Sequence, residues 1–139
     1  MIEEKQQEII GEFSMFSDWM QKYEYIIELG KDLPLIKEEN KTEDNLIRGC
    51  QSRVWLHAEQ ESDGRVVFTA DSDAIITKGL VALMVRVLSE EQPADISQAD
   101  LHFVKEIGLH EHLSPTRSNG LASMISQMKM YAFAFANKA

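Results

Sequence analysis

The chain has 139 residues, of which 44% are hydrophobic and 27% are charged, and these values predict one soluble globular domain over residues 1–139. Its formal net charge of −9 argues against nucleic-acid binding, because phosphates are contacted through Lys and Arg. No apolar run approaches the ~18 residues that span a bilayer, and the acidic N-terminus is unlike a secretory signal, so we expect a cytoplasmic protein that does not bind membranes.

The first thirty residues are predicted to form two helices. Asp18 is placed to cap the second helix, and Gly30 is placed to end it. The acidic segment at residues 31–45 follows, with Pro34 as a helix breaker, and is predicted to be an extended loop. The apolar stripe of the first segment, at helical spacing, consists of Ile9, Phe13, Phe16 and Met20.

The middle of the chain has the pattern of a β-hairpin followed by a helix. Residues 52–60 and 65–70 alternate between inward and outward side chains, and a Gly-containing turn separates them. Asp71, Ser72 or Asp73 is placed to cap the next helix, at about residues 74–89. This helix is apolar around much of its girth, so we expect it at the centre of the core.

The last third of the chain is predicted to be helical. Pro93 and the SPT at residues 114–116 bracket a segment with one or two short helices. From Leu121 to Phe135 apolar side chains recur at i, i+3 and i+4 spacing, which predicts a long final helix. The whole order predicts an α+β fold, in which a small hairpin-based antiparallel sheet packs against N- and C-terminal helices.

Cys50 is the only cysteine, and it lies between Gly49 and the first predicted strand. A single thiol excludes an internal disulfide, a thiolate-rich zinc site and a dithiol centre within this chain. Composition favours a buried structural cysteine, but a glycine at a loop-to-strand junction also suits a reactive group. Arg48 and Arg53 would favour the thiolate if they approach it; otherwise they are exposed arginines. A reactive Cys50 would be a lone nucleophile that holds a transferred group reversibly, for example as a persulfide.

Other polar residues have a chemical interpretation beside a structural one. His110 and His112 would share a face on a strand and could bind metal, but no third ligand is suitably spaced, and surface or capping histidines are favoured. Asp71 and Asp73 would suit acid–base catalysis, although helix capping explains both positions. Arg117 is either an exposed turn residue or a binding residue.

Four blocks of sequence carry a resemblance to a known family. They are WMQKYEYIIELGKDLP at residues 19–34, IRGCQSRVW at 47–55, DSDAIITKGL at 71–80 and LSPTRSNGL at 113–121. Together they resemble the SufE sulfur-acceptor proteins of iron–sulfur cluster assembly over nearly the whole chain. The most specific of them is the signature G-C-Q-S-x-V-W around a single cysteine.

The resemblance implies a fold similar to the scaffold proteins of that pathway, and a SufS-type cysteine desulfurase as partner. Pyridoxal phosphate belongs to that enzyme, so no cofactor or metal is implied for this chain. Cys50 matches the family's acceptor, whose thiolate takes the outer sulfur of the desulfurase persulfide, stimulates the enzyme and passes the sulfur to a SufBCD-type complex. Arg117 matches an arginine that assists sulfur acceptance. The residues implied to hold the cysteine loop are Gly49, Gln51, Ser52 and Asp73.

Three alternatives stay open. A CsdE-like paralogue would serve a different desulfurase, and the four blocks do not separate it from SufE. A non-catalytic adaptor would activate its partner allosterically, with Cys50 incidental. A cysteine hydrolase would need a histidine beside Cys50, and no local pattern links one to it. As an accessory sulfur-transfer protein, the chain would act as a monomer or homodimer and would not turn over a substrate alone.

Overall fold

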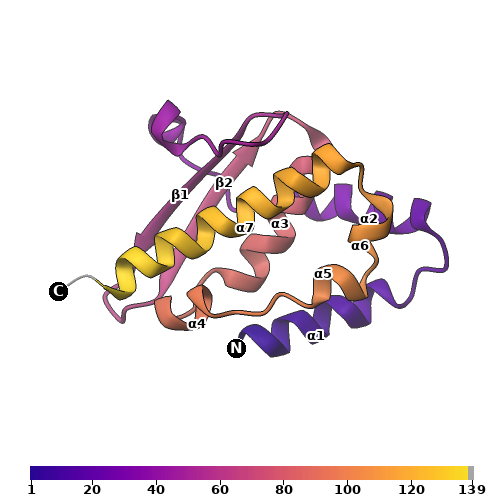
Figure 1. Cartoon of the computed structure of the whole chain (residues 1–139), viewed down its shortest axis with the longest axis horizontal. Helices are drawn as coiled ribbons and strands as arrows, with labels where there is room; N and C mark the ends of the chain where they lie inside the picture. The colour runs from indigo at the N-terminus through magenta and orange to yellow at the C-terminus, as the bar shows by residue number, and fades with distance from the viewer. Residues whose placement is uncertain (138–139) are drawn as a thin grey trace.

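Helices from both ends of the chain pack around a two-stranded antiparallel sheet in the computed structural model, which describes residues 1–137 (Figure 1). This arrangement confirms the predicted α+β fold. None of the helices in this described part combines the length and the apolar character that crossing a membrane requires. In chain order the elements are α1 (Ile2–Phe13), α2 (Trp19–Gly30), the 3-10 turns η1 (Glu38–Asn40) and η2 (Glu43–Asn45), β1 (Val54–Gln60), β2 (Val66–Ser72), α3 (Ile75–Leu88), α4 (Pro93–Ser97), α5 (Phe103–Glu106), α6 (Leu109–His112) and α7 (Pro115–Ala136).

The apolar stripe predicted for the first segment is confirmed only in part. Ile9 and Phe13 are buried in α1, whereas Met20 is 63% exposed because it belongs to the next helix and points to solvent. Asp18 caps that helix as predicted, since its carboxylate accepts a hydrogen bond from the Gln21 N–H at 2.9 Å.

Gly30 ends α2 as predicted, but its importance lies in packing. A Cβ on Gly30 would lie 3.0 Å from the backbone nitrogen of Gly79 in α3, and a Cβ on Gly79 would overlap the carbonyl group of Ile26. The two glycines therefore allow α2 and α3 to pack with their backbones in contact. This contact fixes the position of α3, which forms one wall of the site described below.

The hairpin forms as the alternation predicted, with one face against the core. Strand β1 begins at Val54, two residues later than predicted, because residues 52–53 belong to the preceding loop. The segment at 31–45 is more ordered than the extended loop that was predicted: it contains the 3-10 turns η1 and η2, and Leu35 forms a β-bridge with Ala70. The buried face of the sheet is formed by Val54, Leu56, Val66, Phe68 and Ala70.

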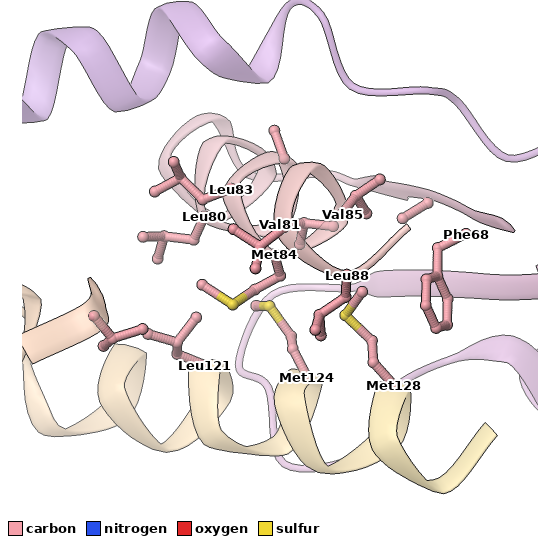
Figure 2. Packing of buried hydrophobic residues seen from close by; sticks show 14 of the residues in the cluster. Phe68, Leu80, Val81, Leu83, Met84, Val85, Leu88, Leu121, Met124 and Met128 are labelled. Atoms are coloured by element: carbon pink, nitrogen blue, oxygen red, sulfur yellow. The ribbon is translucent and has the colours of Figure 1, made fainter. Parts of the chain in front are cut away.

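Helix α3 lies at the centre of the core, as predicted. It is buried along most of its length, and α7 covers one of its sides. Figure 2 shows the inward side chains of α7 pointing toward those of α3. Burial of apolar surface is the dominant stabilising term in folding, so these two helices provide a firm base for the site. The residues that meet here are Leu80, Val81, Met84 and Leu88 of α3, and Leu121, Met124 and Met128 of α7.

Two predictions about helices are wrong. The segment between β2 and α7 contains three short helices after α3 rather than one or two, because Gly108, at φ 88°, separates α5 from α6. No aspartate caps α3: its N-cap residue is Ala74, which has no capping side chain. The Ser72 hydroxyl accepts a hydrogen bond from the Ala74 N–H at 3.3 Å, and the two aspartates make the other bonds described below.

Candidate functional site

Cys50 lies in a short loop that is closed at its base by the backbone. The Ile47 N–H donates to the Val54 carbonyl at 2.8 Å, and Leu46 bridges Trp55 across the edge of β1. The loop therefore projects from the sheet as a hairpin-like excursion over residues 48–53. Cys50 is held in place by the two ends of this loop and by the contacts that the loop makes.

Asp73 fixes the second end of this loop. Its carboxylate accepts a hydrogen bond from the Arg53 N–H at 3.0 Å, and its own N–H donates to the Arg53 carbonyl at 3.2 Å. The side chain thus bonds to the backbone of the loop and does not cap α3. These two bonds tie the backbone at Asp73 and its carboxylate to Arg53, at the end of the loop.

Gly49 can be replaced by no other residue without strain. Its φ of +92° lies in a region that L side chains rarely adopt, and a Cβ there would also lie 2.6 Å from the Ser123 hydroxyl of α7. The backbone conformation and the close approach to α7 each require a glycine. Together they turn the chain where the loop meets α7, and the Cys50 side chain that follows contacts that helix.

The Cys50 thiol rests on the backbone of α7. The side chain is half-buried, and its sulfur lies 3.6 Å from the Gly120 carbonyl oxygen, the distance of a weak S–H hydrogen bond. A Cβ on Gly120 would lie 3.4 Å from Sγ, so the bare glycine leaves the space directly beneath the sulfur open. Gly120 was not identified from the sequence. A glycine inside a helix costs roughly 1 kcal/mol of helix stability relative to alanine. A glycine at the start of the predicted last helix was therefore the sequence signal for a close contact at this position.

A small cavity of about 100 Å³ opens beside the thiol. Gln51 and Ser52 line it from the loop, Thr77 from α3, and Arg117 from the first turn of α7. Pockets for drug-sized ligands have volumes of roughly 300–1,000 Å³, so this cavity suits a group of a few atoms attached to the thiol. The structure therefore places Cys50, Gln51, Ser52 and Arg117, four of the residues singled out in the sequence, around one cavity.

Burial raises the pKa of the Cys50 thiol above its ordinary value. The positive charges of Arg48 and Arg53 do not offset this effect, so the thiolate stabilisation considered for them is not seen in this conformation. At neutral pH the resting side chain is a protonated thiol. Because a thiol is a weaker nucleophile than a thiolate, burial lowers the reactivity of Cys50 in this conformation.

Asp71 and Asp73 do not form a carboxylate pair for acid–base work. Asp71 contacts two lysines, with its oxygens 2.8 Å from Lys41 Nζ and 3.5 Å from Lys78 Nζ. Burial acts to raise the pKa of the Asp71 carboxyl, but the hydrogen bonds from Lys41 and from the Ser72 N–H, with the charge of Lys78, lower it overall. Asp71 is a structural anion that ties the segment before β1 to β2 and α3.

The histidines lie away from the thiol. His110 and His112 belong to α6 rather than to a strand, and the His112 ring stacks on Trp19 with centroids 4.5 Å apart. His57 contacts Glu59 at 3.1 Å. Among the described residues, the cavity lining contains no histidine, and no group of three or more His, Cys, Asp or Glu side chains is placed to hold a metal ion. These residues therefore do not form a cysteine–histidine hydrolase centre.

Comparison with known proteins places this geometry in context. A family model described as SufE, an Fe-S metabolism associated domain, matches residues 7–132. An uncharacterized SufE-like protein of Rhizobium meliloti (strain 1021) is 42% identical over 129 residues, which cover 90% of this chain and 92% of that protein. The solution structure of a hypothetical protein from Thermus thermophilus has the same fold, with a TM-score of 0.79 at 19% identity, covering 96% of this chain and 97% of that one.

Proposed function

The chain belongs to the SufE family, whose domain is associated with Fe–S metabolism, and on this basis we propose that it is a cytoplasmic sulfur acceptor. Cys50 takes persulfide sulfur from a SufS-type cysteine desulfurase, stimulates that enzyme, and passes the sulfur to a SufBCD-type assembly complex. Pyridoxal phosphate is supplied by the desulfurase. The observation that carries the proposal is a lone thiol beside a cavity of about 100 Å³, on a loop that is fixed at both ends.

The transfer is an exchange between sulfur atoms and needs only one thiol from this chain. The Cys50 thiolate attacks the outer sulfur of the donor persulfide. A new S–S bond forms on Cys50 while the S–S bond of the donor breaks, and the donor cysteine leaves as a thiolate that takes up a proton. No external oxidant or reductant is needed. The rate of such an exchange rises with thiolate fraction and access, so the half-buried thiol is a slow, protected form.

Complex formation would therefore move the loop so that the thiol meets its donor. The backbone bonds at Ile47 and Arg53 keep the two ends in place, while the tip at residues 48–52 has fewer ties. Hydrogen exchange of residues 45–55, measured with and without the desulfurase, tests this movement. Unchanged protection in the complex would argue against a gated loop.

Arg117 is placed to act on sulfur once it has arrived. The side chain is exposed and lines the cavity beside the thiol. A guanidinium near the cavity favours the anionic form of a persulfide and of the departing thiolate. Arg117→Ala should weaken sulfur acceptance while the fold stays intact. Arg65→Ala, at an exposed hairpin position, should change neither sulfur acceptance nor the fold. Full transfer activity in Arg117→Ala would remove the residue from the site.

The decisive experiment follows the sulfur atom itself. The protein is incubated with a SufS-type desulfurase and isotope-labelled cysteine, and the Cys50 peptide is examined by mass spectrometry for one additional labelled sulfur. Cys50→Ser should still bind the enzyme but should lose sulfur acceptance and most of the stimulation. Retained stimulation without a persulfide would instead support a non-catalytic adaptor. Repeating the binding measurement with a second desulfurase paralogue would distinguish a CsdE-like protein.

A further inference from the structure

The arginines of this chain are concentrated around the cysteine loop. The chain has five arginines, and three of them adjoin the site: Arg48 and Arg53 within the loop, and Arg117 on the wall of the cavity. All three side chains are exposed. In a chain with 23 acidic and 14 basic residues, this cluster is a local reversal of the overall charge.

These three arginines also lack the ion pairs that the other two arginines form. Arg65 contacts Asp63 at 2.8 Å, and Arg86 Nη1 donates to Glu12 at 2.8 Å. Among the described residues, Arg48, Arg53 and Arg117 take part in no ion pair.

Acidic side chains that border the loop form no ion pair with the three arginines among the described residues. Asp73 bonds to the backbone N–H of Arg53 and not to its guanidinium. Glu43 and Asp44 line a surface groove together with Arg48 but make no ion pair with it. The charge of the three guanidinium groups is therefore free to act outside the chain.

The thiol is not the target of these charges in the resting state. Burial raises the pKa of the Cys50 thiol, and the sulfur lies against the Gly120 carbonyl oxygen at 3.6 Å. An exposed apolar residue lies close to the loop in the chain: Ile75, the first residue of α3, is 69% exposed and follows Asp73, which bonds to the loop, and Ala74, which lines the cavity. A large exposed aliphatic side chain beside unpaired charges is a common composition for a protein-binding surface.

We propose that Arg48, Arg53 and Arg117 form a basic rim that receives an acidic surface of the protein delivering sulfur to Cys50, with Ile75 as its apolar contact. This inference rests on the proposed function, because it assumes that a persulfide-bearing desulfurase meets the loop. The net charge of −9 on this chain repels an acidic surface at long range. A rim of opposite charge around the reacting thiol offsets that repulsion at the one place where contact is needed, and it orients the encounter.

Charge reversal at the two loop arginines tests the rim without altering a residue assigned to the chemistry. Association of Arg48→Glu/Arg53→Glu with a SufS-type desulfurase should be at least about tenfold slower than for the unaltered protein, measured by surface plasmon resonance at about 50 mM salt. The difference should shrink at about 500 mM salt, where charges are screened within a few ångströms. Arg65→Glu makes the same substitution once, at an exposed arginine on the β1–β2 turn, with half the change of charge; it is the control for position and should associate at nearly the unaltered rate.

A second measurement separates an effect on docking from an effect on the thiol. Alkylation of Cys50 by iodoacetamide, which is neutral, should occur at a similar rate in the double variant and the unaltered protein. A comparable slowing of association in Arg65→Glu, or no slowing in the double variant, would contradict the proposed basic rim. An alkylation rate in the double variant that falls as much as its association rate would also contradict it. If the unaltered protein neither binds nor accepts sulfur, the proposed function itself fails, and that result is distinct from each of these.

Discussion

The α3–α7 core and the Cys50 loop lie side by side but are held in different ways. In the core, Leu83, Met84 and Leu88 are completely buried and pack against many neighbours at once. The loop is held by backbone bonds at its base, one carboxylate and a weak sulfur contact. Local opening costs least where few buried apolar contacts must be broken, so the loop can open while the core stays folded.

This difference separates the stability of the fold from the availability of the thiol. Gly49 and Gly120 lie at the boundary, since each allows the loop to touch the rigid surface of α7. Changes in the core should alter the free energy of unfolding without changing how the folded protein presents Cys50. Changes at the boundary should mainly alter how the folded protein presents Cys50, with a smaller effect on the unfolding of the core.

The largest effect is expected in the core. Leu83→Ala removes a completely buried side chain from α3 and should lower the free energy of unfolding by about 3 kcal/mol, because it leaves a cavity in a packed region. Urea denaturation measures the loss, and alkylation of Cys50 in the native protein should be unchanged. The matched control is Met130→Ala, at a position that is 62% exposed, where we expect little change in stability. If Leu83→Ala changed the alkylation rate of Cys50 and left the free energy of unfolding unchanged, the distinction between the two regions would be wrong.

At the boundary, Gly49→Ala is the next largest change. Its φ of +92° and the approach to Ser123 make any Cβ unfavourable, and we expect a cost of roughly 2 kcal/mol, borne mainly by the closed position of the loop. Iodoacetamide should therefore alkylate Cys50 several times faster than in the unaltered protein. Gly11→Ala is the control, since a Cβ there meets nothing within 4 Å and α1 should gain slightly in stability. Unchanged alkylation in Gly49→Ala would show that the loop tolerates the strain.

The fold was largely predictable because its signals are local and periodic. The alternation in the hairpin, the apolar helix α3 and the capping Asp18 each follow from neighbouring residues. The cap of α3 was mispredicted for a physical reason. An aspartate before a helix can bond either to the helix or to another backbone, and Asp73 bonds to Arg53, which is distant in sequence.

The site was predictable only where a motif marked it. Cys50 and Gly49 stand out in the sequence, and Arg117 was suggested by the family motif. Thr77, Gly120 and Ser123 escaped notice because their role depends on helices that approach the loop from elsewhere in the chain. Contacts of this type depend on tertiary packing, which periodicity does not encode.

A smaller effect is expected from removing the carboxylate that holds the loop. Asp73→Ala removes the acceptor for the Arg53 N–H, and closure of the loop should weaken by about 1 kcal/mol. Hydrogen exchange at residues 47–54 should quicken, with the exchange of α3 unaffected. Asp73→Asn retains an oxygen acceptor and should restore part of the protection. Equal exchange in the alanine variant and the unaltered protein would show that the backbone bonds alone hold the loop.

The smallest effect is the dependence of stability on the ionisation of Cys50. Burial raises the pKa of the folded thiol above that of the unfolded chain, which ionises near pH 8.5, so the unfolded state loses its proton first as the pH rises. The stability that depends on Cys50 is complete below that pH and is lost as the pH rises through the folded pKa. Above about pH 8.5 the unfolding free energy of the unaltered protein should therefore fall relative to that of Cys50→Ser. The loss of unfolding free energy in Leu83→Ala involves no ionisable group and should stay constant with pH. A difference between the unaltered protein and Cys50→Ser that does not change with pH would mean that the thiol is as free to ionise in the folded protein as in the unfolded chain, and that the loop does not protect it.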